Sequence, residues 1–127
     1  MLLYDRDCGF CRWSVGVLLA CDRRRVLRPV PLQDPEADRL LAGVGEEERM
    51  ASAHLVSPEG RRWSGGKAAP PLMRLVPGGR PLAYLTERFP RATERAYRWV
   101  ADHRSLVGRP VPERWKAKAD RRIAERA

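Results

Sequence analysis

The chain has 127 residues, a length that suits one domain and allows a hydrophobic core without disulfides or a metal. Its 43% hydrophobic and 32% charged residues exclude a disordered chain. Apolar runs stay far below the roughly 18 residues of a membrane span. Asp5, Arg6 and Asp7 interrupt the apolar start, so we expect no signal peptide and no membrane partner. We therefore expect a cytoplasmic protein, whose thiols are kept reduced.

The chain is basic, with 25 Lys and Arg residues against 16 Asp and Glu residues and a net charge of +9. Residues 109–127 hold seven basic and three acidic residues, so this tail contributes +4 of the +9. Charge alone supports only weak, salt-dependent binding to nucleic acid. We expect a solvated basic surface and no nucleic-acid partner.

The first elements have clear patterns. Leu2–Tyr4 is a short apolar run that predicts a buried first strand. A helix to about Asp22 is predicted next, because apolar residues recur at helical spacing: Cys11, Val15, Leu18 and Leu19. Residues 26–32 predict a second strand, and their two prolines favour an edge position. Asp34, Pro35 and Glu36 then favour a helix start.

The remainder is predicted as a hairpin followed by helices. Residues 53–56 and 61–63 read as two strands around a Pro- and Gly-containing turn at 57–60. Pro70 and Pro71 are expected in a break before the helical part, which comprises residues 72–76, 82–89, 92–106 and 113–125. The last helix is mostly charged, so we expect it to pack weakly or remain mobile.

This order predicts an α/β fold with a thioredoxin-like β-α-β-α-β-β-α core and extra C-terminal helices. We assign residues 1–108 to the domain and residues 109–127 to a basic C-terminal helix or tail.

Cys8 and Cys11 lie at the predicted junction of the first strand and the first helix. Residues i and i+3 share one side of a helix, so the two sulfurs can meet in a small disulfide ring. Free N–H groups and the helix dipole favour a thiolate at the first position. The spacing predicts Cys8 as the nucleophile for a substrate disulfide and Cys11 as the thiol that resolves the mixed disulfide.

The neighbouring charges have opposing effects. A carboxylate of Asp5 or Asp7 near Cys8 opposes thiolate formation, whereas one near Cys11 can accept its proton. Arg6 and Arg12 can offset this negative charge. The sequence does not decide which effect is larger.

Five residues are predicted to form the rim of the site: Gly9, Phe10, Arg6, Arg12 and Trp13. Gly9 lets a partner approach Cys8, Phe10 offers an apolar lip, and Trp13 either lines the rim or simply packs. Cys21 is expected to be a buried small hydrophobe. A structural zinc site needs four ligands. The remaining Cys and His residues are scattered along the chain, namely Cys21, His54 and His103, so we expect no metal.

Residues 3–11, Leu-Tyr-Asp-Arg-Asp-Cys-Gly-Phe-Cys, resemble the opening of the DCC family, whose usual form is Tyr-Asp-Gly-Asp-Cys-x-x-Cys. The resemblance covers roughly residues 2–108, with weaker matches at residues 31–33, at the hairpin with Gly60, and at residues 97–99 and 102–104. It implies a thiol-disulfide oxidoreductase of thioredoxin-like fold, in which Asp5, Asp7, Cys8 and Cys11 match the motif.

The chain departs from the related patterns at two places. Arg6 replaces the usual glycine of the family motif. A thioredoxin has a cis-proline before its third strand, and residues 50–53 contain no proline. We therefore expect substrate handling to differ from that of thioredoxin.

The leading hypothesis is dithiol–disulfide exchange with a protein or small thiol, with the Cys8–Cys11 disulfide as the redox group and no further cofactor. Electrons are then expected from an external thiol reductant, because no nucleotide or flavin motif is visible. The alternative is a non-catalytic thioredoxin-like binding module for an acidic partner. It predicts that Cys8→Ala keeps function and that truncation after Gly108 abolishes it.

Overall fold

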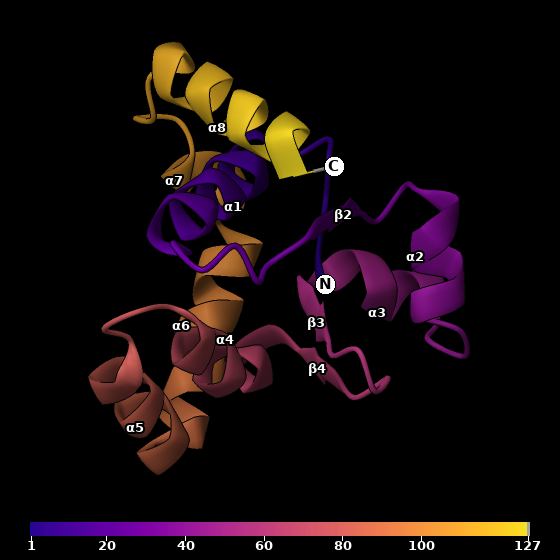
Figure 1. Ribbon diagram of the computed structural model, residues 1–127, viewed down its shortest axis with the longest axis vertical. Coiled ribbons are helices and arrows are strands. Elements are labelled where there is room, and N and C mark those ends of the chain that lie inside the picture. Colours follow the sequence, from indigo (N-terminus) through magenta and orange to yellow (C-terminus); the bar gives the residue numbers. More distant parts are fainter. Residues whose placement is uncertain (127) are drawn as a thin grey trace.

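The computed structural model, which describes residues 1–126, has a four-stranded mixed sheet of order β2-β1-β3-β4 (Figure 1). The strands are β1 (Leu2–Tyr4), β2 (Pro29–Pro31), β3 (His54–Val56) and β4 (Arg62–Ser64). β1 pairs in parallel with β2 and antiparallel with β3, and β3 forms an antiparallel hairpin with β4. This α/β arrangement is the one predicted, and it is consistent with a thioredoxin-like fold.

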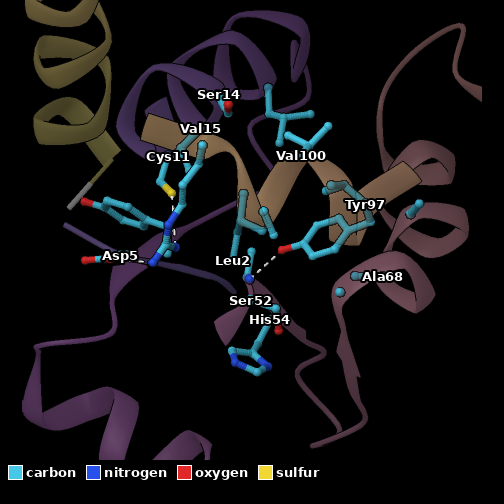
Figure 2. A pocket seen from close by; sticks show the side chains of 18 of the residues that line it. Leu2, Asp5, Cys11, Ser14, Val15, Ser52, His54, Ala68, Tyr97 and Val100 are labelled. Atoms are coloured by element: carbon cyan, nitrogen blue, oxygen red, sulfur yellow. Dashed lines mark hydrogen bonds and ion pairs between the residues drawn. The ribbon is translucent and has the colours of Figure 1, made fainter. Parts of the chain in front are cut away.

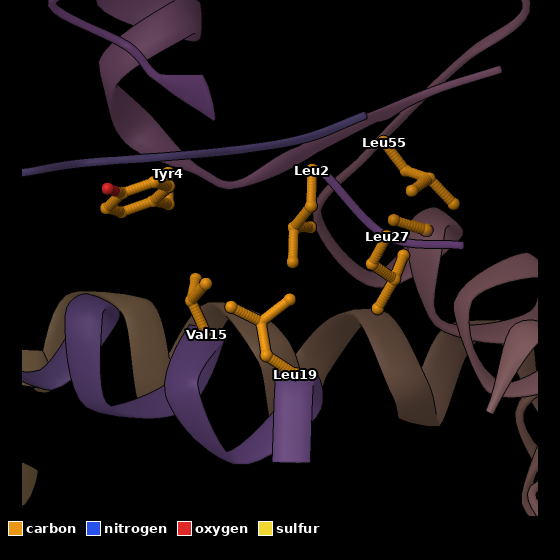
Figure 3. Packing of buried hydrophobic residues seen from close by; sticks show 7 residues of the cluster. Leu2, Tyr4, Val15, Leu19, Leu27 and Leu55 are labelled. Atoms are coloured by element: carbon orange, nitrogen blue, oxygen red, sulfur yellow. The ribbon is translucent and has the colours of Figure 1, made fainter. Parts of the chain in front are cut away.

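The sheet has an apolar core on each face, because side chains alternate along β1. Leu2 and Tyr4 face helix α1 (Gly9–Cys21), and Figure 3 shows them above Val15 and Leu19. Leu3, which is fully buried, faces the other way. It packs in a second cluster with side chains from β2, β3 and helix α2 (Pro35–Leu40): Val30, Leu32, Ala37, Leu41 and Val56.

The first half of the chain follows its local signals. Asp34 caps α2, because its carboxylate accepts the N–H of Glu36 at 2.9 Å and Pro35 occupies the first turn. β2 lies at the edge of the sheet, as its two prolines predict. Its hydrogen-bonded part is shorter than the predicted range, covering Pro29–Pro31.

Several helices differ from the predictions. Helix α3 (Glu46–Ala51) was not predicted, because its three leading glutamates give no apolar period, although they suit the positive end of a helix. A 3₁₀ turn (Gly65–Ala68) leads into α4 (Ala69–Leu75), so Pro70 and Pro71 begin a helix instead of breaking the chain. Helix α5 (Arg80–Arg88) follows. The segment predicted as one helix over residues 92–106 is divided at His103 into α6 (Pro90–Asp102) and α7 (Arg104–Val107).

Two expectations about packing are wrong. Cys21 is exposed, because the last turn of α1 points it away from both apolar clusters. Helix α8 (Glu113–Arg126) does not pack weakly: it lies along α1 in Figure 1, and Ala119 in its middle is buried. A Cβ built on Gly16 of α1 would lie 2.3 Å from the Cβ of Ala119, so the two helices approach closely through small residues.

Candidate functional site

The first cysteine ends a turn that leads from β1 into α1. The N–H of Cys8 donates to the carbonyl of Asp5 at 3.3 Å, which closes the turn. Among residues 1–126, Arg25 is the only non-glycine residue with a positive φ, so Arg6 forms this turn without the conformation that favours glycine. Cys8 is the N-cap of α1, and its Sγ accepts the N–H of Cys11 at 3.3 Å. The Cys8 sulfur therefore lies at the positive end of the helix dipole.

The second cysteine lies one turn into α1, partly buried, and both cysteines are free thiols. Burial raises the pKa of the Cys11 thiol to about 12, with a hydrogen bond and charge from Cys8 acting in the same direction. The guanidinium of Arg104 acts in the opposite direction. The two thiols thus have different surroundings, which allows them different roles.

Asp5 is held in place beside this pair. Its Oδ1 accepts the Nε2 of Gln33 at 2.8 Å and the N–H of Asp7 at 3.0 Å. Gln33 follows β2, and its Oε1 also accepts the N–H of Arg6 at 3.1 Å. Asp7 is exposed, and its carboxylate is 3.4 Å from the same Gln33 amide. Of the two carboxylates, Asp5 is the one directed to the interior.

Arg104, the first residue of α7, connects Asp5 to Cys11. Its Nη1 lies 3.9 Å from the Sγ of Cys11, and its Nη2 lies 3.7 Å from the Oδ2 of Asp5. Both contacts are long, so the guanidinium acts on its two neighbours mainly through its charge. A positive charge here favours the thiolate form of Cys11 over the thiol.

A cavity of about 310 Å³ lies next to Cys11 (Figure 2). Its wall is mainly apolar and is built by β1, α1, the start of β3, α4 and α6. Leu2, Val15, Ala68 and Val100 are among the apolar side chains that Figure 2 labels. Cys11 belongs to this wall, with Asp5 and Arg104 at the same end.

The backbone that faces this cavity from β3 is bonded within the chain. The N–H of Ala53 donates to the hydroxyl of Tyr97 at 2.7 Å, a contact drawn in Figure 2. The carbonyl of Ala53 accepts the N–H of Gly65 at 3.1 Å. Tyr97 comes from α6, and burial raises the pKa of its hydroxyl, so it stays protonated at neutral pH.

Residues 2–110 match the model of the family described as DCC1-like thiol-disulfide oxidoreductase. The chain belongs to this DCC1-like family. The family resemblance inferred from residues 3–11 is thereby confirmed. Neither the curated proteins nor the solved structures contain a match to this chain.

The residues predicted for the rim of this DCC1-like site have different surroundings. Phe10 lines the cavity, and its ring centroid lies 5.9 Å from that of Trp13. Gly9 faces Lys116 of α8, whose side chain would lie 3.4 Å from a Cβ at this position. Arg12 donates to the carbonyl of Arg6 at 3.0 Å. Its Nε lies 3.1 Å from an Asp120 carboxylate oxygen, so it joins α1 to α8.

Sequence reasoning assigned no role to three residues of this DCC1-like site: Gln33, Tyr97 and Arg104. All three fall in the segments that carried the weaker family resemblance, residues 31–33, 97–99 and 102–104. That resemblance was the only signal for them, because Arg104 is 93 residues from Cys11 and Tyr97 is 44 residues from Ala53. The fold brings these segments to Asp5, Cys11 and the start of β3.

Two further observations concern other kinds of site. Within residues 1–126, no group of three or more His, Cys, Asp or Glu side chains is arranged to hold a metal ion. His54, considered above as a zinc ligand, is fully buried, with its ring nitrogens bonded to Ser64 Oγ at 2.6 Å and to the Arg49 carbonyl at 2.9 Å. Across the described helices, none has the length and hydropathy needed to cross a membrane.

Proposed function

We propose that this DCC1-like protein catalyses thiol-disulfide exchange, with Cys8 as the attacking thiol, Cys11 as the resolving thiol and their disulfide as the redox group. The observation that carries the proposal is the hydrogen bond from the Cys11 N–H to the Cys8 Sγ. It holds the partly exposed Cys8 sulfur at the N-terminus of α1, with the second thiol one turn further into the helix. This division of roles is the one that the sequence spacing predicted.

The exchange balances as two displacements. The Cys8 thiolate attacks one sulfur of a substrate disulfide, which forms a mixed disulfide and releases the other sulfur as a thiolate. Cys11 then loses its proton and attacks the Cys8 sulfur, which releases the second substrate thiolate and leaves a Cys8–Cys11 disulfide. The substrate gains two electrons and the protein loses two, so an external thiol reductant must restore the dithiol.

The surroundings of Cys11 suit the second displacement. The charge of a Cys8 thiolate raises the pKa of Cys11 in the free dithiol, and that charge disappears once Cys8 is bonded to substrate. Arg104 remains beside the Cys11 sulfur to favour its thiolate. Asp5 is a candidate for accepting the Cys11 proton, since its carboxylate and the Cys11 thiol both lie beside the Arg104 guanidinium.

Trapping a mixed disulfide tests the proposal. All variants are made in a Cys21→Ser background, because Cys21 is exposed and would react independently. The protein with Cys11→Ser should accumulate one substrate thiol attached to Cys8, detected by intact mass after reaction with bis(2-hydroxyethyl) disulfide. The matched variant Cys8→Ser should accumulate far less, because burial raises the pKa of the Cys11 thiol, which therefore ionises poorly.

The unsubstituted pair should instead form the internal disulfide and release two thiols. Titration of this pair against glutathione would then give its reduction potential and decide whether the protein acts as a reductant or an oxidant. Equal trapping at both cysteines, or no internal disulfide, would refute the assignment of roles.

A further inference from the structure

The cavity beside Cys11 has no role in the exchange steps described above. It is partly open to solvent, and its volume of about 310 Å³ corresponds to about ten water-sized groups. Of the two cysteines, the one in its wall is Cys11, so a molecule that fills the cavity lies against the redox pair. Small-molecule sites in proteins are commonly apolar hollows of this size.

Three polar side chains in the cavity wall, those of Ser14, His54 and Tyr97, already have partners within the chain. Ser14 Oγ donates to the carbonyl of Phe10 at 2.9 Å. The hydroxyl of Tyr97 accepts from Ala53, and the ring of His54 has both nitrogens bonded. A ligand therefore finds an apolar surface with few unmet hydrogen bonds, which favours a hydrocarbon group over a polar one.

The same bonds disfavour an extended peptide in this position. A peptide that pairs with a strand edge needs free N–H and C=O groups on that edge. At the start of β3, the N–H of Ala53 is bonded to Tyr97 and its carbonyl to Gly65. The hydrocarbon group is therefore better supplied by a small molecule than by a peptide chain lying along β3.

We infer that the cavity binds the alkyl chain of a small disulfide, so that the substrate class is a disulfide carried on an alkyl chain of roughly six to eight carbons. This inference rests on the proposed function. The alkyl chain R of a disulfide R–S–S–R′ lies in the cavity, and Cys8 attacks its sulfur and releases R′–S⁻. Cys11 then displaces R–S⁻ from Cys8, so the substrate gains two electrons and the protein, which loses them, is left with a Cys8–Cys11 disulfide.

A series of substrates of increasing chain length tests this inference. The probes are mixed disulfides of 2-mercaptoethanol with straight-chain alkanethiols of two to ten carbons, reacted with the reduced protein. Burying one methylene stabilises a complex by a factor of about four, so kcat/KM should rise about two- to fourfold per carbon. The rise should stop at about six to eight carbons, when the cavity is full.

Two variants fill the cavity from different helices, which guards against the misfolding of either one. Ala101→Leu from α6 and Ala69→Leu from α4 should each stop the rise at a shorter chain. The matched control is Ala96→Leu, which adds the same atoms to the exposed side of α6 and should leave the series unchanged. A series that stays flat, or that rises equally in all three variants, would overturn the inference.

The test separates this inference from the proposed function. Reaction with bis(2-hydroxyethyl) disulfide together with a flat alkyl series would refute the alkyl substrate and leave thiol-disulfide exchange standing. Failure to react with any disulfide would refute both. Hexyl methyl thioether cannot exchange, so its binding is measured independently of the chemistry. Calorimetry should show that it binds the unsubstituted protein and that binding is lost in Ala101→Leu. No binding to either protein would overturn the inference.

Discussion

Cys8 and Cys11 are three residues apart in the chain and differ in what surrounds them. Cys8 is at the N-cap, where its sulfur meets a backbone N–H. Cys11 lies in the cavity wall, between a buried apolar surface and Arg104. Since burial removes water from a thiolate without replacing all of its hydrogen bonds, the difference should be visible in the reactivity of each thiol.

Alkylation should therefore be selective. With a pKa of about 12, Cys11 is ionised in about one molecule in ten thousand at pH 8. Iodoacetamide at pH 8 should modify Cys8 and the exposed Cys21 while Cys11 stays a thiol. The slow modification of Cys11 should speed up about tenfold per pH unit up to pH 10. Fragmentation mass spectrometry of the peptide 7–12 distinguishes the two sites. Modification of Cys11 as fast as Cys21 would contradict the pKa assignment.

Arg104 should accelerate the second displacement more than the first. Its charge lowers the pKa of Cys11, so Arg104→Met should raise that pKa and slow release of the second substrate thiol about tenfold near pH 8. Release of the first thiol, which depends on Cys8, should change much less. Stopped-flow measurement of both releases checks this.

The conservative variant shows whether charge is the cause. Arg104→Lys should recover most of the lost rate, and Arg109→Met, which removes an exposed arginine nearby, should have little effect. Equal slowing of both releases in Arg104→Met, without recovery by lysine, would indicate a structural role instead.

Between elements, the closest approach is that of α1 and α8. Gly16 and Ala119 meet there, and a Cβ added at Gly16 would also lie 2.7 Å from the Cα of Ala119. The backbone of α8 cannot rotate away as a flexible side chain can, so the whole helix has to shift. Small residues at this crossing are what allow α8 to cover α1.

Gly16→Ala should for this reason destabilise the protein, although alanine stabilises an exposed helix position by about 1 kcal/mol relative to glycine. We expect a loss of about 1–3 kcal/mol in the free energy of unfolding, measured by urea denaturation, because the core becomes overpacked. The matched variant is Ala20→Gly on the exposed side of the same helix, where alanine should be the more stable residue by about 1 kcal/mol. A stabilising Gly16→Ala would show that the crossing is loose.

The elements that the sequence predicted are those with a local signal. Leu2–Tyr4, the period of α1, and the cap at Asp34 each act within a few residues, and each appears where expected. α3 has no apolar stripe, and its acidic first turn was not recognised as a helix start. The packing of α8 depends on Ala119 meeting Gly16, and a small residue in a charged helix gives no sign of its partner.

The candidate site divides in the same way. The spacing of Cys8 and Cys11 predicted their meeting at the start of a helix, because the geometry of one helical turn fixes it. Arg104 and Tyr97 reach the site only through the fold, from segments 93 and 44 residues distant from their partners. The cavity is also a property of the fold, since elements from both halves of the chain contribute to its wall.

At the scale of the whole molecule, the C-terminal helix α8 packs on α1 and so belongs to the folded structure. The family match does not include this helix, because it ends at residue 110. Arg126, near its end, donates to the carboxylate of Asp22 at 2.8 Å and to the carbonyls of Leu19, Asp22 and Leu27 at 3.1–3.2 Å. These groups lie where α1 ends and the chain turns toward β2. One guanidinium therefore joins the end of α8 to the end of α1 and the segment after it, at Leu19 and Leu27 of the apolar cluster drawn in Figure 3.

This ion pair should be a main source of stability, because the side chain of Asp22 is 0% exposed and that of Arg126 is 11% exposed. Arg126→Met should lower the free energy of unfolding by about 3 kcal/mol, the lower end of the range for a broken buried pair, since Asp22 keeps the N–H groups of Leu27 and Val26. Arg121→Met, exposed on the same helix, should change it by less than about 0.5 kcal/mol. Equal effects of the two variants on the free energy of unfolding would refute this role of the Arg126–Asp22 ion pair.

The contribution of Asp22 should also depend on pH in a defined direction. Burial alone raises the pKa of Asp22, but the N–H groups of Leu27 and Val26 and the Arg126 guanidinium together hold it below its ordinary value. A carboxyl with a lowered pKa stabilises the fold above about pH 4, its value in the unfolded chain, and this stabilisation is lost as the pH falls through the folded value. The difference in unfolding free energy between the unsubstituted protein and Arg126→Met should therefore shrink as the pH is lowered from 6 to 3, measured by urea denaturation at each pH. A difference that stays constant over this range would mean that Arg126 acts through packing and its bonds to carbonyls rather than through the charge of Asp22.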